Sequence, residues 1–315
     1  MEDRGKKGVA EFWDQNPHVA EDPEFWMAHP LCRRGINRRV SGRDSVWPLD
    51  FLYERAGSPR FDTMLSLGSG MGHVERAIRR LDIAGTVEAI DGSSVSVDIA
   101  KQKAAEEGLA GITYSVADLN RLSLPRRRYP AIVFHQSLHH VFAVERLLDV
   151  VRTALKPEGL LFLEEWTGPS RTEWTRAKMD RLDALFQEIP LEWRKGPELK
   201  PPIEEHDPTE AVRSSAIRPG VRRLFRILVD RPYGGQLVSV FLPQLRRDLI
   251  PPAALDALLA RWLALESEEL ASNPDASFYN AILATPKTGP RAVAGRIANA
   301  AVRGALALAV GNAER

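Results

Sequence analysis

Apolar runs and amphipathic segments alternate along residues 62–163. Short runs rich in Val, Ile, Leu and Phe are typical of buried strands, and apolar positions three and four residues apart are typical of helices. The pattern predicts strands at 62–68, 86–92, 112–119, 131–137 and 160–165, helices at 72–82, 94–108 and 143–155, and a turn at 156–159. Strands that alternate with helices form a parallel sheet covered on both faces, which binds its ligand at the carboxyl ends of the strands.

The two flanks of this core have a different character. The N-terminal flank is rich in aromatic residues between Phe12 and Tyr53. The C-terminal flank predicts helices at 172–189 and 254–270 and strands at 223–235 and 277–287. We therefore divide the chain into an aromatic and arginine-rich lid segment (1–58), a core (59–170), a part with helical insertions and the last two strands (171–288), and an alanine- and arginine-rich tail (289–315).

Composition places the chain among soluble globular proteins. Its 315 residues are 44% hydrophobic, and the net charge of +1 argues against a protein whose main partner is nucleic acid. Cys32 is the single cysteine, so no internal disulfide can form, which suits a reducing compartment. The sequence does not begin with a secretory signal, and no apolar run approaches the roughly 20 residues of a membrane-spanning helix. We expect a cytoplasmic protein without an integral membrane segment.

The sequence LSLGSGMG ends the first predicted strand and carries three alternating glycines, Gly68, Gly70 and Gly72. A phosphate-binding P-loop requires Lys followed by Ser or Thr, and a dinucleotide fingerprint requires glycine where His73 stands, so neither pattern matches. Alternating glycines allow backbone N–H groups to approach a ligand closely. The loop therefore predicts a ligand that lies close to the backbone, and neither phosphate-binding pattern is present.

Two acidic residues end the next two predicted strands. Asp91 lies 19 residues beyond Gly72, where a carboxylate can accept both hydroxyl groups of a ribose. Asp118 ends the third strand, where an adenine ring would lie. The glycine loop and these carboxylates together predict a nucleoside site.

Five segments, LSLGSGMG, VEAIDGS, YSVADLN, YPAIVFHQSLHHV and LKPEGLLFLEEW, resemble in order and spacing the class I S-adenosylmethionine-dependent methyltransferases. The resemblance covers residues 62–166, about a third of the chain. It implies an α/β fold with a Rossmann-like seven-stranded sheet and helices on both faces. It also implies S-adenosylmethionine as the cofactor and S-adenosylhomocysteine as its product.

The same resemblance implies where the cofactor binds. The three glycines pack against its amino-acid half, Asp91 binds the ribose, and Asp118 with Leu119 flanks the adenine. The further expected cofactor contacts are Gly92, Gln136 and Trp13. Trp13 lies in EFWDQNP, which resembles a lid over the methionine end of the cofactor; the alternative is that Trp13 anchors a helix to the core.

The expected catalytic residues follow the fourth and fifth strands. Transfer from a sulfonium requires alignment, and it requires a base only when the acceptor must lose a proton. His139 and His140 are the candidate bases, because histidine titrates near neutral pH; helix capping or packing is the alternative for each. Glu165 is expected to orient a hydroxyl group or a histidine, and a solvated strand end is the alternative. His135 is expected in the core, and we expect no metal site, because neither an HExxH motif nor a nearby cysteine accompanies the histidines.

The acceptor is expected to contact Arg34, Arg38, Trp166 and Tyr233. Arg34 and Arg38 share a face of a predicted helix, as do Arg39 and Arg43, and arginine suits anion recognition. A solvated face is the alternative for the arginines, and packing is the alternative for Tyr233.

The flanking sequences EEWTGPSRTEWT, DPTEAVRSSAI and DRPYGGQL resemble bacterial methyltransferases associated with glycosyltransferases and envelope polysaccharides. We therefore expect O-methylation of a saccharide or another small polar metabolite. The alternatives are a small-molecule N- or C-methyltransferase, a catalytically silent cofactor-fold partner protein, and a nicotinamide dehydrogenase. The tail predicts either weak membrane-surface association or a loosely docked helix, and a homodimer is among the expectations.

Overall fold

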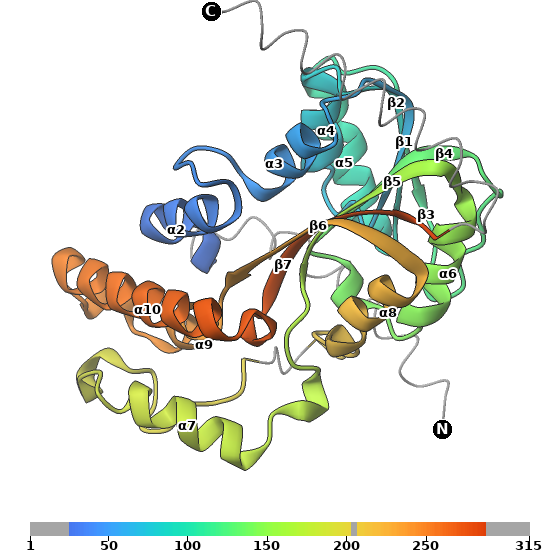
Figure 1. The fold of residues 1–315 in the computed structure, drawn as a ribbon. Helices are drawn as coiled ribbons and strands as arrows, with labels where there is room; N and C mark the ends of the chain where they lie inside the picture. Colours follow the sequence, from blue (N-terminus) through green and yellow to red (C-terminus); the bar gives the residue numbers. More distant parts are fainter. Residues whose placement is uncertain (1–24, 203–206, 288–315) are drawn as a thin grey trace, which may run out of the picture.

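The computed structural model describes residues 25–202 and 207–287, whose elements surround one seven-stranded sheet (Figure 1). The strands are β1 (Phe61–Leu67), β2 (Ala84–Asp91), β3 (Ile112–Val116), β4 (Tyr129–His135), β5 (Leu155–Trp166), β6 (Phe225–Gly234) and β7 (Tyr279–Pro286). Their order across the sheet is β3-β2-β1-β4-β5-β7-β6. The first five strands pair in parallel, and β7 is antiparallel to both β5 and β6.

Helices cover both faces of the sheet. The α-helices are α2 (Pro30–Ser41), α3 (Pro48–Arg55), α4 (His73–Arg80), α5 (Ser94–Glu106), α6 (Val144–Ala154), α7 (Arg176–Phe186), α8 (Ile217–Leu224), α9 (Val238–Phe241) and α10 (Pro252–Ser272). Short 3-10 helices are η2 (Trp26–Ala28), η3 (Leu138–His140), η4 (Arg171–Glu173), η5 (Leu191–Trp193), η6 (Ser214–Ala216), η7 (Leu242–Gln244), η8 (Arg247–Leu249) and η9 (Pro274–Ala276).

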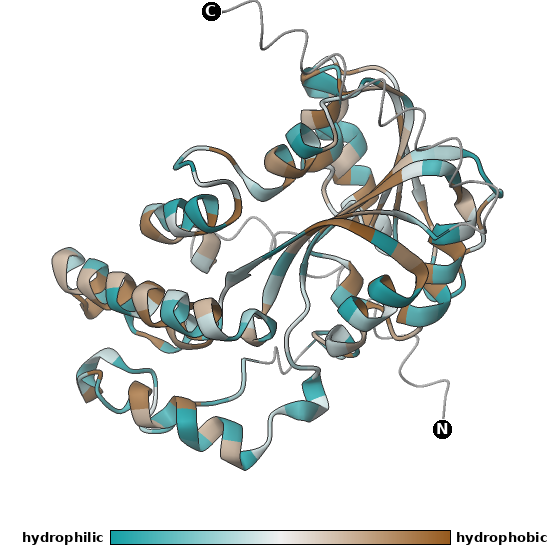
Figure 2. Cartoon of the chain, viewed as in Figure 1, coloured by the Kyte–Doolittle hydropathy of each residue, from teal (hydrophilic) through white to brown (hydrophobic). Residues whose placement is uncertain are grey.

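Two hydrophobic clusters lie on opposite faces of the strands. Phe51 of α3 and Ile78 of α4 join the cluster that contains Met64 and Val133, whereas Leu147 of α6 belongs to the cluster on the other face. Hydrophobic residues run along the middle of the sheet, whereas β6 also carries hydrophilic stretches (Figure 2). A sheet buried on both faces is expected for parallel strands, and the α/β fold class predicted from the sequence is confirmed.

Two local expectations are wrong. Residues 156–159 belong to β5 and do not form a turn, because the pairing of β4 with β5 shifts between Tyr129 and Ala131 and takes up the extra residues as an irregularity in the strand. Arg43 does not share a helical face with Arg39, because α2 ends at Ser41. The next residue, Gly42, has a φ of 77°, a left-handed conformation that commonly ends a helix.

Helix α10, the last α-helix of the described residues, packs between α2 and the end of β6. It packs against α2, α9 and β6, so residues far apart in the sequence lie side by side (Figure 1). Arg39 of α2 donates to the Glu266 carboxylate at 2.8 Å and to the Tyr233 carbonyl at 2.9 Å. Glu266 is fully buried and also accepts from the backbone N–H groups of Leu237 and Val238.

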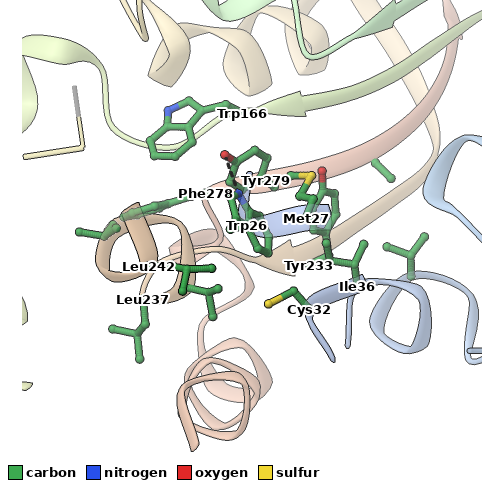
Figure 3. Packing of buried hydrophobic residues seen from close by; sticks show 14 of the residues in the cluster. Trp26, Met27, Cys32, Ile36, Trp166, Tyr233, Leu237, Leu242, Phe278 and Tyr279 are labelled. Carbon is green, nitrogen blue, oxygen red and sulfur yellow. Dashed lines mark hydrogen bonds between the residues drawn. The ribbon is translucent and has the colours of Figure 1, made fainter. Parts of the chain in front are cut away.

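An aromatic cluster fills the core between these elements. Trp26, Tyr233 and Tyr279 pack beside one another, and Trp166 lies against Tyr279 from the end of β5 (Figure 3). In residues 25–202 and 207–287, no helix combines the length and the apolar character that crossing a bilayer requires.

Loss of the Arg39 guanidinium should destabilise the protein much more than loss of its neighbour Arg38. The Arg39→Ala substitution leaves the Glu266 carboxylate buried without its cation, which costs on the order of 3–5 kcal/mol. Arg38 is exposed and pairs with Asp44 at the surface, where an ion pair contributes little. Urea unfolding of both variants measures the two free energies, and equal losses would contradict this account of the ion pair.

Candidate functional site

The loops at the carboxyl ends of β1 and β4 touch each other. A Cβ added to Gly68 would lie 2.3 Å from the Ser137 Cβ, so only glycine allows this approach. The Ser137 hydroxyl donates to the Leu67 carbonyl at 2.8 Å. The glycine loop therefore lies directly beside the segment that carries His139 and His140.

Asp91 lies at the end of β2 and binds the glycine loop. Its carboxylate accepts from the Gly70 N–H at 2.7 Å and from the Ser93 N–H at 2.9 Å. Burial raises the pKa of Asp91, although these backbone donors act in the opposite direction. A Cβ added to Gly70 or to Gly92 would meet no atom within 4 Å, so open space adjoins this carboxylate.

The loop after β3 is bound to the segment after β4. The Asp118 carboxylate accepts from the Asn120 N–H at 2.8 Å. The Asn120 side-chain oxygen in turn accepts from the N–H groups of Phe142 and Ala143 at 2.9 and 3.0 Å. Leu119 is partly buried against the hydrophobic cluster below. The four loops at the carboxyl ends of β1 to β4 thus form one continuous surface.

Glu165 organises the segment that follows β4. Its carboxylate is fully buried and accepts from the N–H groups of Ser137 and Leu138 at 2.9 and 2.6 Å. The other oxygen contacts Nδ1 of His139. Burial alone would lower the pKa of His139, but the Glu165 charge and hydrogen bond raise it to about 9. The expectation that a carboxylate of the fifth strand orients a histidine agrees with this contact.

His140 has a similar arrangement with residues that follow α7. Its Nδ1 lies 3.0 Å from the Thr209 hydroxyl and 3.2 Å from the Asp207 carboxylate. Glu210 lies on the other side of both imidazoles, with Oε2 3.9 Å from each Nε2. His139 and His140 therefore direct Nδ1 toward separate carboxylates and Nε2 toward a shared one.

Glu164 forms a second polar cluster on the opposite face of β5. Side chains of successive strand residues point to opposite faces of a sheet, so the carboxylates of Glu164 and Glu165 lie on opposite faces of β5. Glu164 is fully buried, accepts from Tyr233 and from Nε2 of Gln136 at 2.9 Å, and lies 2.6 Å from Nδ1 of His135. Gln136 has a φ of 50°, a conformation that is rare for a residue with a side chain and that clusters at functional sites.

The other residues expected to contact the acceptor differ in how exposed their side chains are. Trp166 and Tyr233 are buried, and the Trp166 indole donates to the Pro169 carbonyl at 3.3 Å. Arg34 is exposed on α2, and Arg38 forms an exposed pair with Asp44, so their role in acceptor binding stays a prediction. Trp13 and the tail lie outside the described residues.

Sequence reasoning missed three carboxylates of this region. Asp207 and Glu210 meet the histidines only through the fold, and their local sequence DPTE carries no signal of it. Glu75 lies in the first turn of α4, directly after the glycine loop, and is fully buried, with the Ser66 side chain as a polar neighbour. Burial raises the pKa of Glu75 to about 7.

Comparisons with known proteins agree with this architecture. Residues 64–159 match a family described as a methyltransferase domain. The chain is 27% identical over 146 residues to a ubiquinone biosynthesis O-methyltransferase of Bartonella tribocorum, covering 44% of this chain and 58% of the relative. It is 29% identical over 113 residues to a demethylmenaquinone methyltransferase of Chlamydia pneumoniae, covering 36% and 48%. The chain thus spans about half the length of these curated relatives.

A solved structure shares the fold. Haemonchus contortus phosphoethanolamine N-methyltransferase 2, solved in complex with S-adenosyl-L-methionine, superposes with a TM-score of 0.52 at 14% identity, covering 89% of this chain and 60% of that one. The likeness to this structure is one of fold, and it agrees with the seven-stranded α/β sheet that the sequence predicts. Residues 64–159 are the part of the chain that matches the methyltransferase domain family.

Replacement of Glu75 by Gln should reduce the loss of stability that occurs as pH rises from about 4.5 to above 7. The pKa of Glu75 rises from 4.5 to about 7 on folding, so the folded state holds a proton that the unfolded state loses between these values. Stability therefore falls as pH rises through this window, by about 3 kcal/mol once Glu75 is ionised in both states. The stability of Glu75→Gln relative to the native protein should increase by this amount between pH 4.5 and 8 in urea unfolding. Parallel pH profiles of the two proteins would refute the assignment.

Proposed function

We propose that this chain, which carries a methyltransferase domain at residues 64–159, transfers a methyl group from S-adenosylmethionine to a hydroxyl oxygen of a small polar molecule. The expected acceptor is a saccharide or another hydroxylated metabolite. The cofactor supplies a methyl group already activated by a sulfonium. The protein therefore has to align the acceptor oxygen with that carbon and keep water away.

The described residues fit this cofactor. The open space beside Gly70 and Gly92 adjoins the Asp91 carboxylate, which can still accept ribose hydroxyls because a carboxylate has about four lone-pair sites. Gly68, Gly70 and Gly72 would contact the amino-acid half, and Asp118 with Leu119 would border the adenine. Gln136 is the first residue after β4, at the start of the segment that carries His139 and His140, and its side chain donates to the Glu164 carboxylate.

The observation that carries the hydroxyl assignment is the orientation of His139 and His140. Both Nδ1 atoms contact acidic or hydroxyl partners, and both Nε2 atoms lie near the Glu210 carboxylate. Groups held in this way can bind a hydroxyl and assist the loss of its proton, which an oxygen acceptor requires. The relative named as an O-methyltransferase supports transfer to oxygen. A catalytically silent partner protein would bind the cofactor without turning over any acceptor.

The cofactor assignment is tested by binding of S-adenosylhomocysteine and of NAD. We expect calorimetry to detect S-adenosylhomocysteine and not NAD, and we expect Gly70→Ala to abolish most of that binding because its Cβ enters the open space beside Asp91. Gly42→Ala is the matched control. Gly42 also has a positive φ, so its substitution carries a similar strain of about 1–2 kcal/mol, but it lies at the end of α2. Binding of NAD, or equal affinity in both variants, would overturn the assignment.

The acceptor side is tested by His139→Ala and His140→Ala. Each variant should lose turnover on a panel of saccharides, phenols and amines by roughly 10²–10⁴-fold while it binds S-adenosylhomocysteine normally. The measurement is transfer of labelled methyl groups alongside calorimetry. Full rates in both variants would show that the histidines have no part in the reaction, and methylation confined to amines would replace the oxygen assignment.

A further inference from the structure

We propose that His139, His140 and Glu210 form a binding site for a divalent transition-metal ion of the zinc type. These side chains can bind the ion whatever reaction the protein catalyses. The role of the ion, which is to hold and polarise the acceptor oxygen, rests on the function proposed above. This proposal departs from the expectation of no metal site, which rested on the lack of an HExxH motif and of a nearby cysteine; Glu210, the third ligand, lies about 70 residues beyond the histidines.

The donor atoms of the three side chains converge. One nitrogen from each imidazole and one Glu210 oxygen all lie within 4.8 Å of one another. Oε2 of Glu210 is 3.9 Å from each Nε2. Two ligands of a tetrahedral zinc ion are about 3.4 Å apart when each is about 2.1 Å from the metal. The two Glu210–histidine separations exceed this by about half an ångström, and no pair of donors exceeds it by more than about 1.4 Å, which side-chain rotation can close.

The hydrogen-bond partners of the other ring nitrogen, Nδ1, support metal ligation independently. A histidine that binds a metal nearly always donates its other ring N–H to a carboxylate or carbonyl, which fixes its tautomer and orientation. His139 contacts the buried Glu165 carboxylate through Nδ1, and His140 contacts Asp207 and Thr209 through Nδ1. Both imidazoles are thus held with Nε2 toward Glu210, and each has the supporting carboxylate that a metal ligand requires.

The charge of the region also suits a cation. Glu165, Asp207 and Glu210 place three carboxylates around two imidazoles, and the side chains of Glu165 and Asp207 are 0% and 2% exposed. Buried charges are unfavourable unless they are paired. A divalent ion between the two Nε2 atoms would offset this negative charge directly.

The backbone fixes Glu210 next to the histidines. The Val212 N–H donates to the His139 carbonyl at 3.2 Å, and the Ala211 carbonyl accepts from the Arg171 N–H at 2.7 Å. Within the side-chain cluster, Asp207 accepts from the Thr209 N–H at 2.7 Å. These bonds connect the two segments at the level of the site, so the ligand set is already assembled without a metal ion.

Two histidines and one glutamate leave a tetrahedral ion one open position, as in catalytic zinc sites. An acceptor hydroxyl bound there loses its proton to solvent more readily, because the cation stabilises the oxygen's negative charge. The oxygen then forms a bond to the methyl carbon as the sulfur–carbon bond breaks. The electron pair of that bond stays on sulfur, and neutral S-adenosylhomocysteine leaves.

The test is calorimetric titration of zinc chloride into metal-stripped, untagged full-length protein. We expect about one ion per chain, and we expect Glu210→Gln and His139→Ala each to weaken binding at least tenfold. Asp207→Asn should weaken it by about 10–100-fold, because it disturbs only the residue behind His140. Cobalt(II) in place of zinc should give the visible absorption of a tetrahedral site in the native protein and lose it in Glu210→Gln.

Glu269→Gln is the matched control. The Glu269 side chain, on α10, is 29% exposed against 24% for Glu210, and it pairs with Arg181 of α7 away from the histidines. It should bind zinc as the native protein does. Circular dichroism and S-adenosylhomocysteine binding show that each variant is folded. Zinc binding no stronger in the native protein than in Glu210→Gln would overturn the metal site. Normal S-adenosylhomocysteine binding in that experiment would leave the proposed function intact, so the two failures are distinguishable.

Discussion

The site depends on two adjacent carboxylates that are both fully buried at the end of β5. Because strand residues alternate, Glu164 and Glu165 point to opposite faces of the sheet and must find separate donors. Glu165 takes the N–H groups of Ser137 and Leu138 and the His139 ring, which fixes the segment after β4. Glu164 takes Tyr233 and Gln136, which joins β4 and β5 to the end of β6. One dipeptide thus positions both sides of the region where the acceptor would lie.

The glycine loop and the histidine segment are coupled by packing as well as by hydrogen bonds. Gly68 is in direct contact with Ser137, whose hydroxyl binds the end of β1. Asp91 accepts from the Gly70 N–H, and Asn120 binds the start of the segment that leads into α6. The glycine loop and the backbone that carries His139 are therefore held together by direct contacts.

Two ionisable groups near the site, Glu75 and His139, have pKa values that differ from those of the free side chains. Glu75 is fully buried, and burial raises its pKa to about 7 although the Ser66 side chain acts in the opposite direction. The charge of Glu165 and its hydrogen bond raise the pKa of His139 to about 9, against the effect of burial.

The sequence by itself determined the parallel core, the order of its strands along the chain and the location of the glycine loop. These features follow from local patterns, since strand alternation, helical spacing and glycine backbone freedom act over a few residues. It also identified Asp91, His139, His140 and Glu165 as residues to examine, because each lies at the end of a predicted strand or just beyond it. It erred at residues 156–159, where proline and glycine indicate a turn but pairing with β4 keeps the chain in the sheet.

Only the tertiary structure decided which partners these residues have. His140 meets Thr209 across 69 residues, and Arg39 meets Glu266 across 227, and no periodicity or motif encodes such contacts. The structure likewise brought Glu210 to the two histidines, so that donor atoms of three side chains lie within 4.8 Å of one another. The physical reason is that hydrogen bonds and metal ligation depend on distances of a few ångströms, which are set by how the segments pack together and not by their order along the chain.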